Sequence, residues 1–310
     1  MINTVYRLVA PRRFEIAFED INLFGENAIV RPTYLSICNA DMRYYLGTRD
    51  AKVLAEKLPM ALIHEGVGEV FLDPTGTFKT GDKVVMVPNA PVEKDEFIAE
   101  NYLRSSKFCG SSMDGFLQEF VEISPKRLVK LPDDIDMTVA AFTEIVSVSV
   151  HAISRFDKIA HARRNTISVW GDGNLGYITS LFLKYHFPKS KIVVFGTSSD
   201  KLADETHLVN EVPNGFTTDH AFECVGGNGS PIAIEQIIGL IKPEGTISIL
   251  GVSEYPVPIN TRMILEKGLR VFGSSRSGVK DFAKTVDMYK KHPEIIDYLG
   301  NLINSVNVVR

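Results

Sequence analysis

One glycine-rich turn constrains the fold of this chain more than any other feature of its sequence. Residues 171–176 read Gly-Asp-Gly-Asn-Leu-Gly, which fits the pattern G-x-G-x-x-G. An apolar run at residues 166–170 precedes the turn, and a second at 177–186 follows it with the spacing of a helix. A strand that enters a helix through this pattern is the context in which the pattern indicates phosphate binding. The sequence therefore predicts a nucleotide-binding strand–turn–helix unit.

The residues of this turn have separate roles in that interpretation. Gly171 permits the tight turn, Gly173 lets a pyrophosphate approach the backbone, and Gly176 lets the helix pack on the strand. Asn174 and Leu175 begin the helix, whose N-terminal N–H groups face the phosphates. The alternative is an ordinary strand–helix turn with incidental glycines, which the two flanking apolar runs disfavour.

Apolar runs of strand length recur around this turn and alternate with helical segments. They are residues 166–170, 191–195, 219–224 and 245–251. Strands separated by helices form a doubly wound parallel sheet, the Rossmann arrangement. We therefore expect an α/β fold in which residues 146–275 form a Rossmann domain.

The first half of the chain is richer in strand signals than in helix signals. Expected strands are residues 28–33, 66–72, 84–87 and 116–123, and residues 137–156 are expected to form a helix capped by Asp136. Residues 88–114 have weak periodicity and suggest a lobe. We expect residues 1–145 and 276–310 to form a second, β-rich domain.

The end of the second Rossmann strand decides between the two nicotinamide dinucleotides. An acid at this position binds the ribose 2′-hydroxyl and would repel a 2′-phosphate. The position holds Gly196, and the residues that follow offer hydroxyl groups and a cation, namely Thr197, Ser198, Ser199 and Lys201. The sequence therefore favours NADPH over NADH. Asp200 would favour NADH if it took the place of the missing acid.

Composition excludes several classes of protein. The only cysteines among 310 residues are Cys38, Cys109 and Cys224, too far apart for a disulfide-rich scaffold or a Cys-x-x-Cys zinc ribbon. The chain has 34 Lys+Arg against 38 Asp+Glu, which disfavours nucleic-acid binding by bulk charge. No apolar run reaches the roughly 18 residues of a membrane span, and the N-terminus lacks the core of a signal peptide. We expect a cytoplasmic protein.

Residues that bind metal ions occur at three places before the glycine turn. They are Cys38 with Asp41, His64 with Glu65, and Glu144 in an apolar helical run. A thiolate, an imidazole and carboxylates form a catalytic zinc site with one open position. Cys38 or His64 taken alone is better explained as a structural residue of the core. Glu144 is more informative, because an unpaired carboxylate in an apolar helix is costly.

These motifs in this order resemble the zinc-dependent medium-chain dehydrogenase/reductase superfamily. The order is C-x-x-D at 38–41, I-H-E-G at 63–66, G-D-K-V at 81–84, an acid before the glycine turn, and F-E-C-V-G at 222–226. The resemblance runs from about residue 25 to the end of the chain. It implies a GroES-like catalytic domain beside the Rossmann domain. Glu144 stands where alcohol dehydrogenases have a second cysteine, and in this respect the chain resembles the polyol (sorbitol-type) branch.

A narrower resemblance is to the NADPH-dependent ribulose-5-phosphate reductases, carried by residues 38–50, 58–66 and 100–108. That family makes ribitol 5-phosphate, which a cytidylyltransferase converts to CDP-ribitol for teichoic acids or capsules. The resemblance implies a sugar-phosphate substrate and a homodimer or homotetramer. It also implies one catalytic zinc on Cys38, His64 and Glu144, with Glu65 as a further or exchangeable ligand and Asp41 behind His64.

A phosphorylated substrate needs cationic donors. The segments that carry the narrower resemblance contain four candidates, which are Arg43, Arg49, Arg104 and Lys107. Solvated surface charge is the equally good alternative for each of them taken alone.

Three features depart from the family pattern. The lobe holds only Cys109 of the four cysteines that bind a structural zinc in many relatives, so we expect no structural zinc. Ala40 stands where the family often has a hydroxyl for proton relay, which leaves Tyr44 or a zinc-bound water. The chain stops at Arg310 without the usual last helix and strand, so we expect a shortened form.

Two other functions stay open. The first is an NAD-dependent polyol or threonine-type dehydrogenase, which cofactor preference distinguishes. The second is a dinucleotide-binding protein without catalysis. Ala40 and the short C-terminus favour it, whereas four retained metal-type ligands disfavour it.

Overall fold

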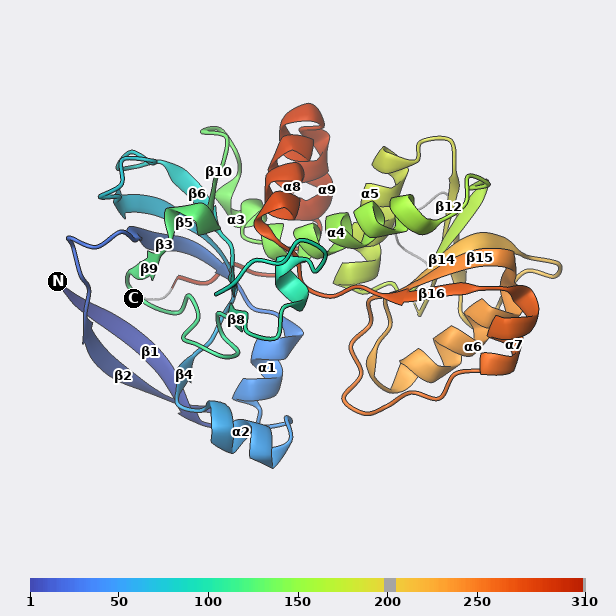
Figure 1. The fold of residues 1–310 in the computed structure, drawn as a ribbon, viewed down its shortest axis with the longest axis horizontal. Helices are drawn as coiled ribbons and strands as arrows, with labels where there is room; N and C mark the ends of the chain where they lie inside the picture. The colour runs from blue at the N-terminus through green and yellow to red at the C-terminus, as the bar shows by residue number, and fades with distance from the viewer. Residues whose placement is uncertain (198–204, 309–310) are drawn as a thin grey trace. The chain divides into compact units, whose positions relative to one another are not determined.

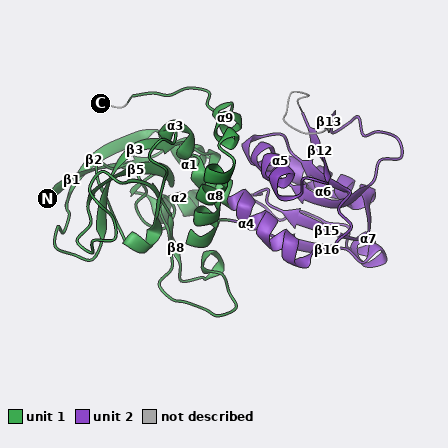
Figure 2. Ribbon diagram, turned by 90° about the horizontal axis from the view of Figure 1, so that it is seen from above, with its two compact units in different colours: residues 1–147, 276–310 green, residues 148–275 purple. Residues whose placement is uncertain are grey.

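The structure is a computed structural model that describes residues 1–197 and 205–308. The chain divides into two compact units, of which unit 1 is residues 1–147 with 276–310 and unit 2 is residues 148–275 (Figure 2). The candidate metal ligands all belong to unit 1, and the glycine turn belongs to unit 2.

Unit 1 is built on antiparallel sheets (Figure 1). One sheet has the strand order β2-β1-β4 and another has the order β10-β6-β5-β3-β9, while β7 and β8 form a separate pair. The strands are β1 (Ile2–Ala10), β2 (Arg13–Asp20), β3 (Ala28–Ser36), β4 (Met60–Ala61), β5 (Glu65–Leu72), β6 (Lys83–Met86), β7 (Asn89–Ala90), β8 (Lys107–Phe108), β9 (Val121–Ile123) and β10 (Leu128–Lys130).

Alternation along these strands buries one side of the larger sheet. Val30, Val70, Val84 and Met86 are almost fully buried, and they pack with Phe116 in one core cluster. Because strand side chains point alternately to opposite faces, a period of two in hydrophobicity gives such a core. The lobe at residues 88–114 contains only β7, β8 and a short 3-10 turn, as its weak periodicity predicts.

Short helices cover unit 1. They are α1 (Asn39–Tyr45), α2 (Ala51–Lys57), α3 (Met137–Ala140), the start of α4 (Thr143–Ile159), α8 (Val279–Lys291) and α9 (Glu294–Gly300), with 3-10 turns η1 (Glu100–Tyr102) and η2 (Pro125–Arg127). Phe282 and Val286 of α8 pack in one cluster with Val67 and Val85. The C-terminal segment therefore completes the core of the β-rich unit.

Two sequence expectations about elements of unit 1 are wrong. The helix expected over residues 137–156 is two helices, because the chain breaks at residues 141–142 and Thr143 donates its hydroxyl hydrogen bond to the carbonyl of Ala140 at 2.6 Å. The strand expected over residues 116–123 is reduced to β9. The backbone N–H of Phe116 bonds to the carbonyl of Ile63 at 2.7 Å instead, so this segment braces the chain before His64.

Unit 2 holds one parallel sheet of six strands in the order β13-β12-β11-β14-β15-β16. This order is the doubly wound one, with the glycine turn after its first strand, as the sequence predicts. The strands are β11 (Thr166–Trp170), β12 (Lys191–Gly196), β13 (Glu205–Leu208), β14 (Thr218–Glu223), β15 (Ile241–Ile249) and β16 (Arg270–Gly273). The helices are α5 (Asn174–His186), α6 (Ser230–Leu240) and α7 (Thr261–Lys267), with the 3-10 turn η3 (Gly227–Gly229).

Both faces of this sheet are covered by helices. On one face Trp170 stacks on Phe195 with ring centroids 4.4 Å apart, and both pack in a cluster with Ile237 of α6. Phe222 of β14 packs on Phe156 of α4 with centroids 5.1 Å apart. Figure 1 shows α5 above the strands and α6 and α7 below them. Burial on both faces explains why these strands are apolar runs rather than alternating ones.

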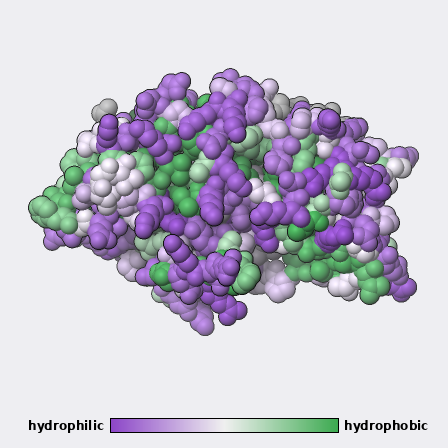
Figure 3. Space-filling view, turned by 45° about the horizontal axis from the view of Figure 1, so that its top comes forward, coloured by the Kyte–Doolittle hydropathy of each residue, from purple (hydrophilic) through white to green (hydrophobic). Residues whose placement is uncertain are grey.

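In the part of the chain that the structure describes, no helix is long and apolar enough to cross a membrane. Figure 3 shows hydrophilic residues over most of one face of the molecule, with hydrophobic residues scattered between them.

His220 is a fully buried histidine in the middle of β14. Its Nδ1 accepts a hydrogen bond from the N–H of Thr246 at 3.1 Å, so the proton is assigned to Nε2, which lies 3.1 Å from the carbonyl oxygen of Arg163. Burial lowers the pKa of His220 to about 4, and the neighbouring His161 lowers it too. The folded chain therefore keeps this side chain neutral.

We expect the free energy of unfolding to fall as the pH drops from about 6.5 to about 4. In this window His220 takes up a proton in the unfolded chain and not in the folded one, which is worth at most about 3 kcal/mol. The variant His220→Asn keeps an acceptor for the N–H of Thr246. Denaturant titrations at several pH values should show that its free energy of unfolding depends less steeply on pH than that of the wild type. His186→Asn, at an exposed histidine, is the control. Equal slopes for the wild type and His220→Asn would contradict the assignment.

Candidate active site

Cys38 is presented by the turn from β3 into α1, where it is the residue that caps the helix. One carboxylate oxygen of Asp41 accepts hydrogen bonds from the N–H of Cys38 and from its thiol, each at 3.0 Å. The other oxygen accepts from the N–H of Ile63 at 3.0 Å. One buried carboxylate thus joins the start of α1 to the segment that carries His64.

The backbone before His64 is strained and firmly held. Ile63 has a φ of 70°, a conformation that a β-branched residue rarely adopts. A Cβ on Gly115 would lie 2.3 Å from the carbonyl oxygens of both Ile63 and Leu62, so only a glycine lets the two segments approach. Such strain costs roughly 1–3 kcal/mol and persists where the surroundings fix the backbone. The direction of the His64 side chain is therefore set by its neighbours.

The structure brings Cys38, His64 and Glu65 together. Their ligand atoms lie within 4.8 Å of one another, and Cys38 Sγ is 3.6 Å from His64 Nε2. Nδ1 of His64 lies 3.9 Å from a carboxylate oxygen of Asp41, so Nε2 is the nitrogen that points to the site. A thiolate, an imidazole and a carboxylate in this arrangement fit a catalytic zinc with a fourth position for water or substrate.

Charge in this site needs compensation. Burial raises the pKa of Glu65 well above its usual range, and Glu144 raises it further. Burial also raises the pKa of Glu144, whereas His64 lowers it. The pKa of the Cys38 thiol is raised by burial and by Asp41 and Glu65. A divalent cation would let the thiolate and the carboxylates be ionised together, so the donor set fits zinc.

The other residues predicted from sequence are placed unevenly. Glu144 is buried at the start of α4 but lies outside the group of three ligands, so its place in the ligand set stays a prediction. Tyr44 is buried, and the guanidinium of Arg49 lies 4.9 Å from the centre of its ring. Burial lowers the pKa of Arg43, and the charge of Arg49 lowers it further. The two arginines therefore lie near each other.

Arg104 and Lys107 are exposed. Lys107 directly precedes Phe108 on β8, and the ring of Phe108 packs on His64 with centroids 5.2 Å apart. Neighbouring strand residues point to opposite sides, so Lys107 points away from the ligand group. This direction disfavours Lys107, and the assignment of the substrate phosphate to Arg43, Arg49 or Arg104 stays a prediction.

Arg276 is a residue near the site that the sequence did not reveal. Its guanidinium carbon lies 4.5 Å from the ring centre of Phe108. It stands in the segment Ser-Ser-Arg-Ser-Gly after β16, and no spacing or motif marks it. Only the fold brings it to residues more than a hundred positions earlier in the chain.

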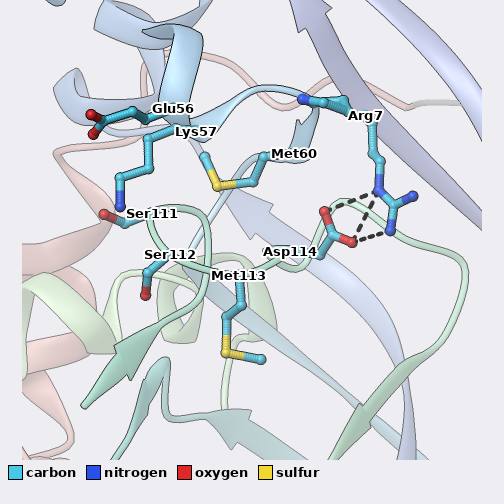
Figure 4. Close-up of a pocket in the computed structure, with 9 residues that line it drawn as sticks. Arg7, Glu56, Lys57, Met60, Ser111, Ser112, Met113 and Asp114 are labelled. Carbon is cyan, nitrogen blue, oxygen red and sulfur yellow. Dashed lines mark hydrogen bonds and ion pairs between the residues drawn. The ribbon is translucent and has the colours of Figure 1, made fainter. Parts of the chain in front are cut away.

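A separate pocket of about 260 Å³ lies in unit 1 and holds none of the candidate ligands (Figure 4). It is lined by Arg7, Glu56, Lys57, Pro59, Met60, Ser111, Ser112, Met113 and Asp114. Arg7 and Asp114 are paired, with Arg7 Nε 3.0 Å from Asp114 Oδ2, and Asp114 also accepts from the N–H of Ala61 at 2.7 Å. Charges of both signs line the pocket, and two of them already compensate each other.

The glycine turn between β11 and α5 has space for a phosphate. Gly171 has a φ of 108°, and a Cβ there would lie 2.8 Å from the backbone of Cys224. A Cβ on Gly176 would lie 1.9 Å from the carbonyl oxygen of Gly171, so the helix packs as closely as predicted. Nothing lies within 4 Å of a Cβ on Gly173, directly before Asn174 and Leu175 at the start of α5. Open space at a helix N-terminus fits a pyrophosphate.

Asp172 is a second residue whose role the sequence did not reveal. Its carboxylate accepts a hydrogen bond from the N–H of Thr197 at 2.9 Å. A Cβ on Gly196 would lie 2.4 Å from the Cβ of Asp172, so Asp172 occupies the space beside the end of β12. The remaining predicted cofactor residues, Ser198, Ser199 and Lys201, lie outside the described residues, as does Asp200.

Comparisons with known proteins agree with this arrangement. The family model "Alcohol dehydrogenase GroES-like domain" matches residues 25–133, and "Zinc-binding dehydrogenase" matches residues 191–291. Ribulose-5-phosphate reductase 1 of Staphylococcus aureus is 56% identical over 97% of this chain and 90% of its own length. Ribulose-5-phosphate reductase of Bacillus spizizenii is 55% identical over 100% of this chain and 92% of its own length. A crystal structure of S. aureus TarJ in complex with NADPH has a TM-score of 0.87 at 50% identity, over 99% of this chain and 93% of that one. The predicted fold class, a GroES-like domain with a parallel Rossmann sheet, is confirmed.

Removal of the thiolate should remove the metal. We expect the wild type to bind about one zinc per chain and Cys38→Ser to lose most of it, because an un-ionised serine hydroxyl is a poor zinc ligand. Elemental analysis after zinc loading and dialysis measures this. Cys109→Ser, at a buried cysteine in the core of unit 1, should keep its zinc. Equal zinc contents in the two variants would contradict the assignment of Cys38.

The two buried glutamates can be told apart by their effect on zinc affinity. We expect Glu65→Gln to weaken zinc binding by about 10-fold or more and Glu144→Gln to weaken it less, because only Glu65 belongs to the group of three ligand atoms. Glutamine is a neutral side chain of the same shape, so both variants should fold. Competition with a chromophoric chelator measures the affinities. A larger loss in Glu144→Gln would instead make Glu144 the third ligand.

Proposed function

The chain belongs to the ribulose-5-phosphate reductases, a family of zinc-binding dehydrogenases, and on this ground we propose that it reduces D-ribulose 5-phosphate to D-ribitol 5-phosphate with NADPH. The observation that carries the proposal is the identity above one half to two ribulose-5-phosphate reductases over nearly the whole chain. As an enzyme of this family it is an oxidoreductase that acts on a CH–OH group.

The residues of unit 1 would hold the metal and the reacting ketone. When bound, zinc polarises the C2 ketone and NADPH supplies the hydride. Cys38, His64 and Glu65 would ligate the metal, with Glu144 as a further ligand or as a partner of the fourth position. Asp41 fixes Cys38 and the segment before His64 through the hydrogen bonds described above.

The oxygen on C2 gains a proton as the alcohol forms. Ala40 has no hydroxyl, so we propose Tyr44 as the side chain that passes this proton to the C2 oxygen, directly or through water. Tyr44 is 4% exposed and packs in one cluster with Leu62 and Ile63, beside the segment that carries His64. Arg43 and Arg49 bind the substrate phosphate on this side of the site.

NADPH is the proposed cofactor in preference to NADH. Gly196 places no acid at the end of β12, and Thr197 follows it with a hydroxyl group. The solved TarJ structure at 50% identity contains NADPH. We also propose a single, catalytic zinc, because the lobe carries one cysteine, Cys109, rather than four.

The product has a place in cell-wall chemistry by analogy with the family. A cytidylyltransferase would convert ribitol 5-phosphate to CDP-ribitol for teichoic acid or capsule synthesis in the cytoplasm. We propose a homodimer or homotetramer as the working form.

An assay of NADPH oxidation tests cofactor, metal and substrate together. We expect turnover with ribulose 5-phosphate, loss of turnover on zinc chelation, and recovery when zinc is restored. NADH, and ribulose without its phosphate, should each lower kcat/KM by about 10-fold or more, since each lacks a charged phosphate contact.

Three results would contradict the proposal. Equal rates with ribulose and ribulose 5-phosphate would show that the enzyme does not recognise the phosphate. A preference for NAD with an unphosphorylated polyol would instead support the polyol-dehydrogenase alternative. NADPH binding without turnover on any keto-sugar phosphate would support the non-catalytic one.

A further inference from the structure

Arg276 lies beside the candidate metal site, in the part of unit 1 that follows β16. Its guanidinium carbon is 4.5 Å from the ring centre of Phe108, and that ring centre is 5.2 Å from the centre of the His64 imidazole. Because both distances are measured from the ring of Phe108, the guanidinium can lie no farther than about 10 Å from the centre of the His64 ring. Stacking on an aromatic face favours a cation at this position.

The backbone at Arg276 is left-handed, and hydrogen bonds of the three residues that follow it hold it in place. Its φ is 56°, a conformation that residues with a side chain rarely adopt and glycine adopts freely. The next residue, Ser277, shares a hydrogen bond of 2.6 Å with the hydroxyl of Ser147. The N–H of Gly278 donates to Asp281 at 3.1 Å, and the N–H of Val279 donates to Glu100 at 2.8 Å. An arginine is thus kept where the backbone alone would prefer a glycine.

The charge of Arg276 is not committed to an acid. Within residues 1–197 and 205–308, no carboxylate lies within ion-pair distance of its guanidinium. Partial burial lowers the pKa of Arg276, while Glu144 and Tyr44 raise it. A guanidinium in this position can bind an anionic group that enters beside the metal site.

Other arginines lie near the same tyrosine. Arg49 stacks on the ring of Tyr44 at 4.9 Å, and Arg43 is near enough to Arg49 for the two charges to repel. Tyr44 also favours the charged form of both Arg43 and Arg276. A doubly charged anion among these side chains would reduce the repulsion between them.

We propose that Arg276 binds the 5-phosphate of the substrate and thereby sets the distance of the C2 ketone from the metal site; this inference rests on the proposed function. The C2 carbon and the phosphorus of ribulose 5-phosphate are separated by about five bonds of roughly 1.5 Å, or roughly 6 Å along an extended chain. A guanidinium–phosphate pair adds roughly 4 Å, given donor–acceptor distances of about 2.8 Å. The combined length of roughly 10 Å does not exceed the upper bound that the ring of Phe108 sets on the distance between the guanidinium and His64.

Arg276 would then act as a specificity residue for phosphorylated keto-sugars. The competing explanation is that Arg276 only offsets the charge of Glu144. These two roles differ in what they control, because a phosphate ligand sets the KM of the substrate whereas a partner of Glu144 sets the affinity for zinc.

The test uses Arg276→Gly in the full, zinc-loaded protein. We expect the KM for ribulose 5-phosphate to rise by about 10- to 100-fold, as for the loss of a charged hydrogen-bonded pair. The zinc content should stay unchanged, and the Tm should stay equal or rise because glycine adopts this φ without strain. Arg276→Lys keeps the charge but not the two-pronged donor, so its KM should lie between those of the wild type and the glycine variant.

Arg12→Gly is the matched control. Arg12 is an exposed arginine with a φ of 62° in the turn between β1 and β2, so the substitution removes the same charge from the same kind of backbone. Its KM for ribulose 5-phosphate should equal that of the wild type. Equal KM values in Arg276→Gly and Arg12→Gly would overturn the inference. A loss of zinc in Arg276→Gly would overturn it in favour of the Glu144 role.

Calorimetric titration with inorganic phosphate separates this inference from the proposed function. We expect wild type and Arg12→Gly to bind phosphate equally and Arg276→Gly to bind it about 10-fold more weakly. If the wild type does not reduce ribulose 5-phosphate, the proposed function fails, and the phosphate titration still decides whether Arg276 is an anion-binding residue. Equal phosphate affinity in all three proteins, or no binding to any of them, would overturn the inference.

Discussion

The carboxylate of Asp41 joins the two segments of unit 1 on which the candidate metal site depends. It holds the capping turn of α1 through Cys38 and the strained turn before His64 through the N–H of Ile63. Neither segment would position its ligand alone, because α1 is a short helix and Ile63 has a disfavoured φ. A single buried acid therefore links secondary structure, backbone strain and ligand geometry.

Much of this molecule could be predicted because its signals are local. The glycine turn needs three glycines for three reasons that follow from backbone geometry, and the structure shows a tight turn at Gly171, open space at Gly173 and close packing at Gly176. The strands of unit 2 are continuous apolar runs, and so could be recognised, because helices cover both faces of their sheet. The order of the motifs was enough to indicate the family.

The parts that could not be predicted depend on contacts between distant segments. The strand expected over residues 116–123 keeps only its last three residues, because the N–H of Phe116 bonds to Ile63 in another part of unit 1. The break between α3 and α4 goes with a local hydrogen bond from Thr143 to Ala140, which hydrophobic periodicity does not show. Small differences in distance decide which carboxylate lies with Cys38 and His64. Glu65, and not Glu144, belongs to the group of three ligand residues. Arg276 reaches the site only through Phe108, and no pattern in the sequence pairs these two residues.

The contact between Asp172 and Gly196 limits the routes by which cofactor preference could change. In enzymes of this architecture an acid at the end of the second strand selects NAD, so a single substitution of Gly196 would be the shortest route. Here the Cβ of any such residue would meet the side chain of Asp172 at 2.4 Å. Position 172 must therefore change before, or together with, position 196. The two residues form an epistatic pair, in which the effect of a substitution at position 196 depends on the residue at position 172.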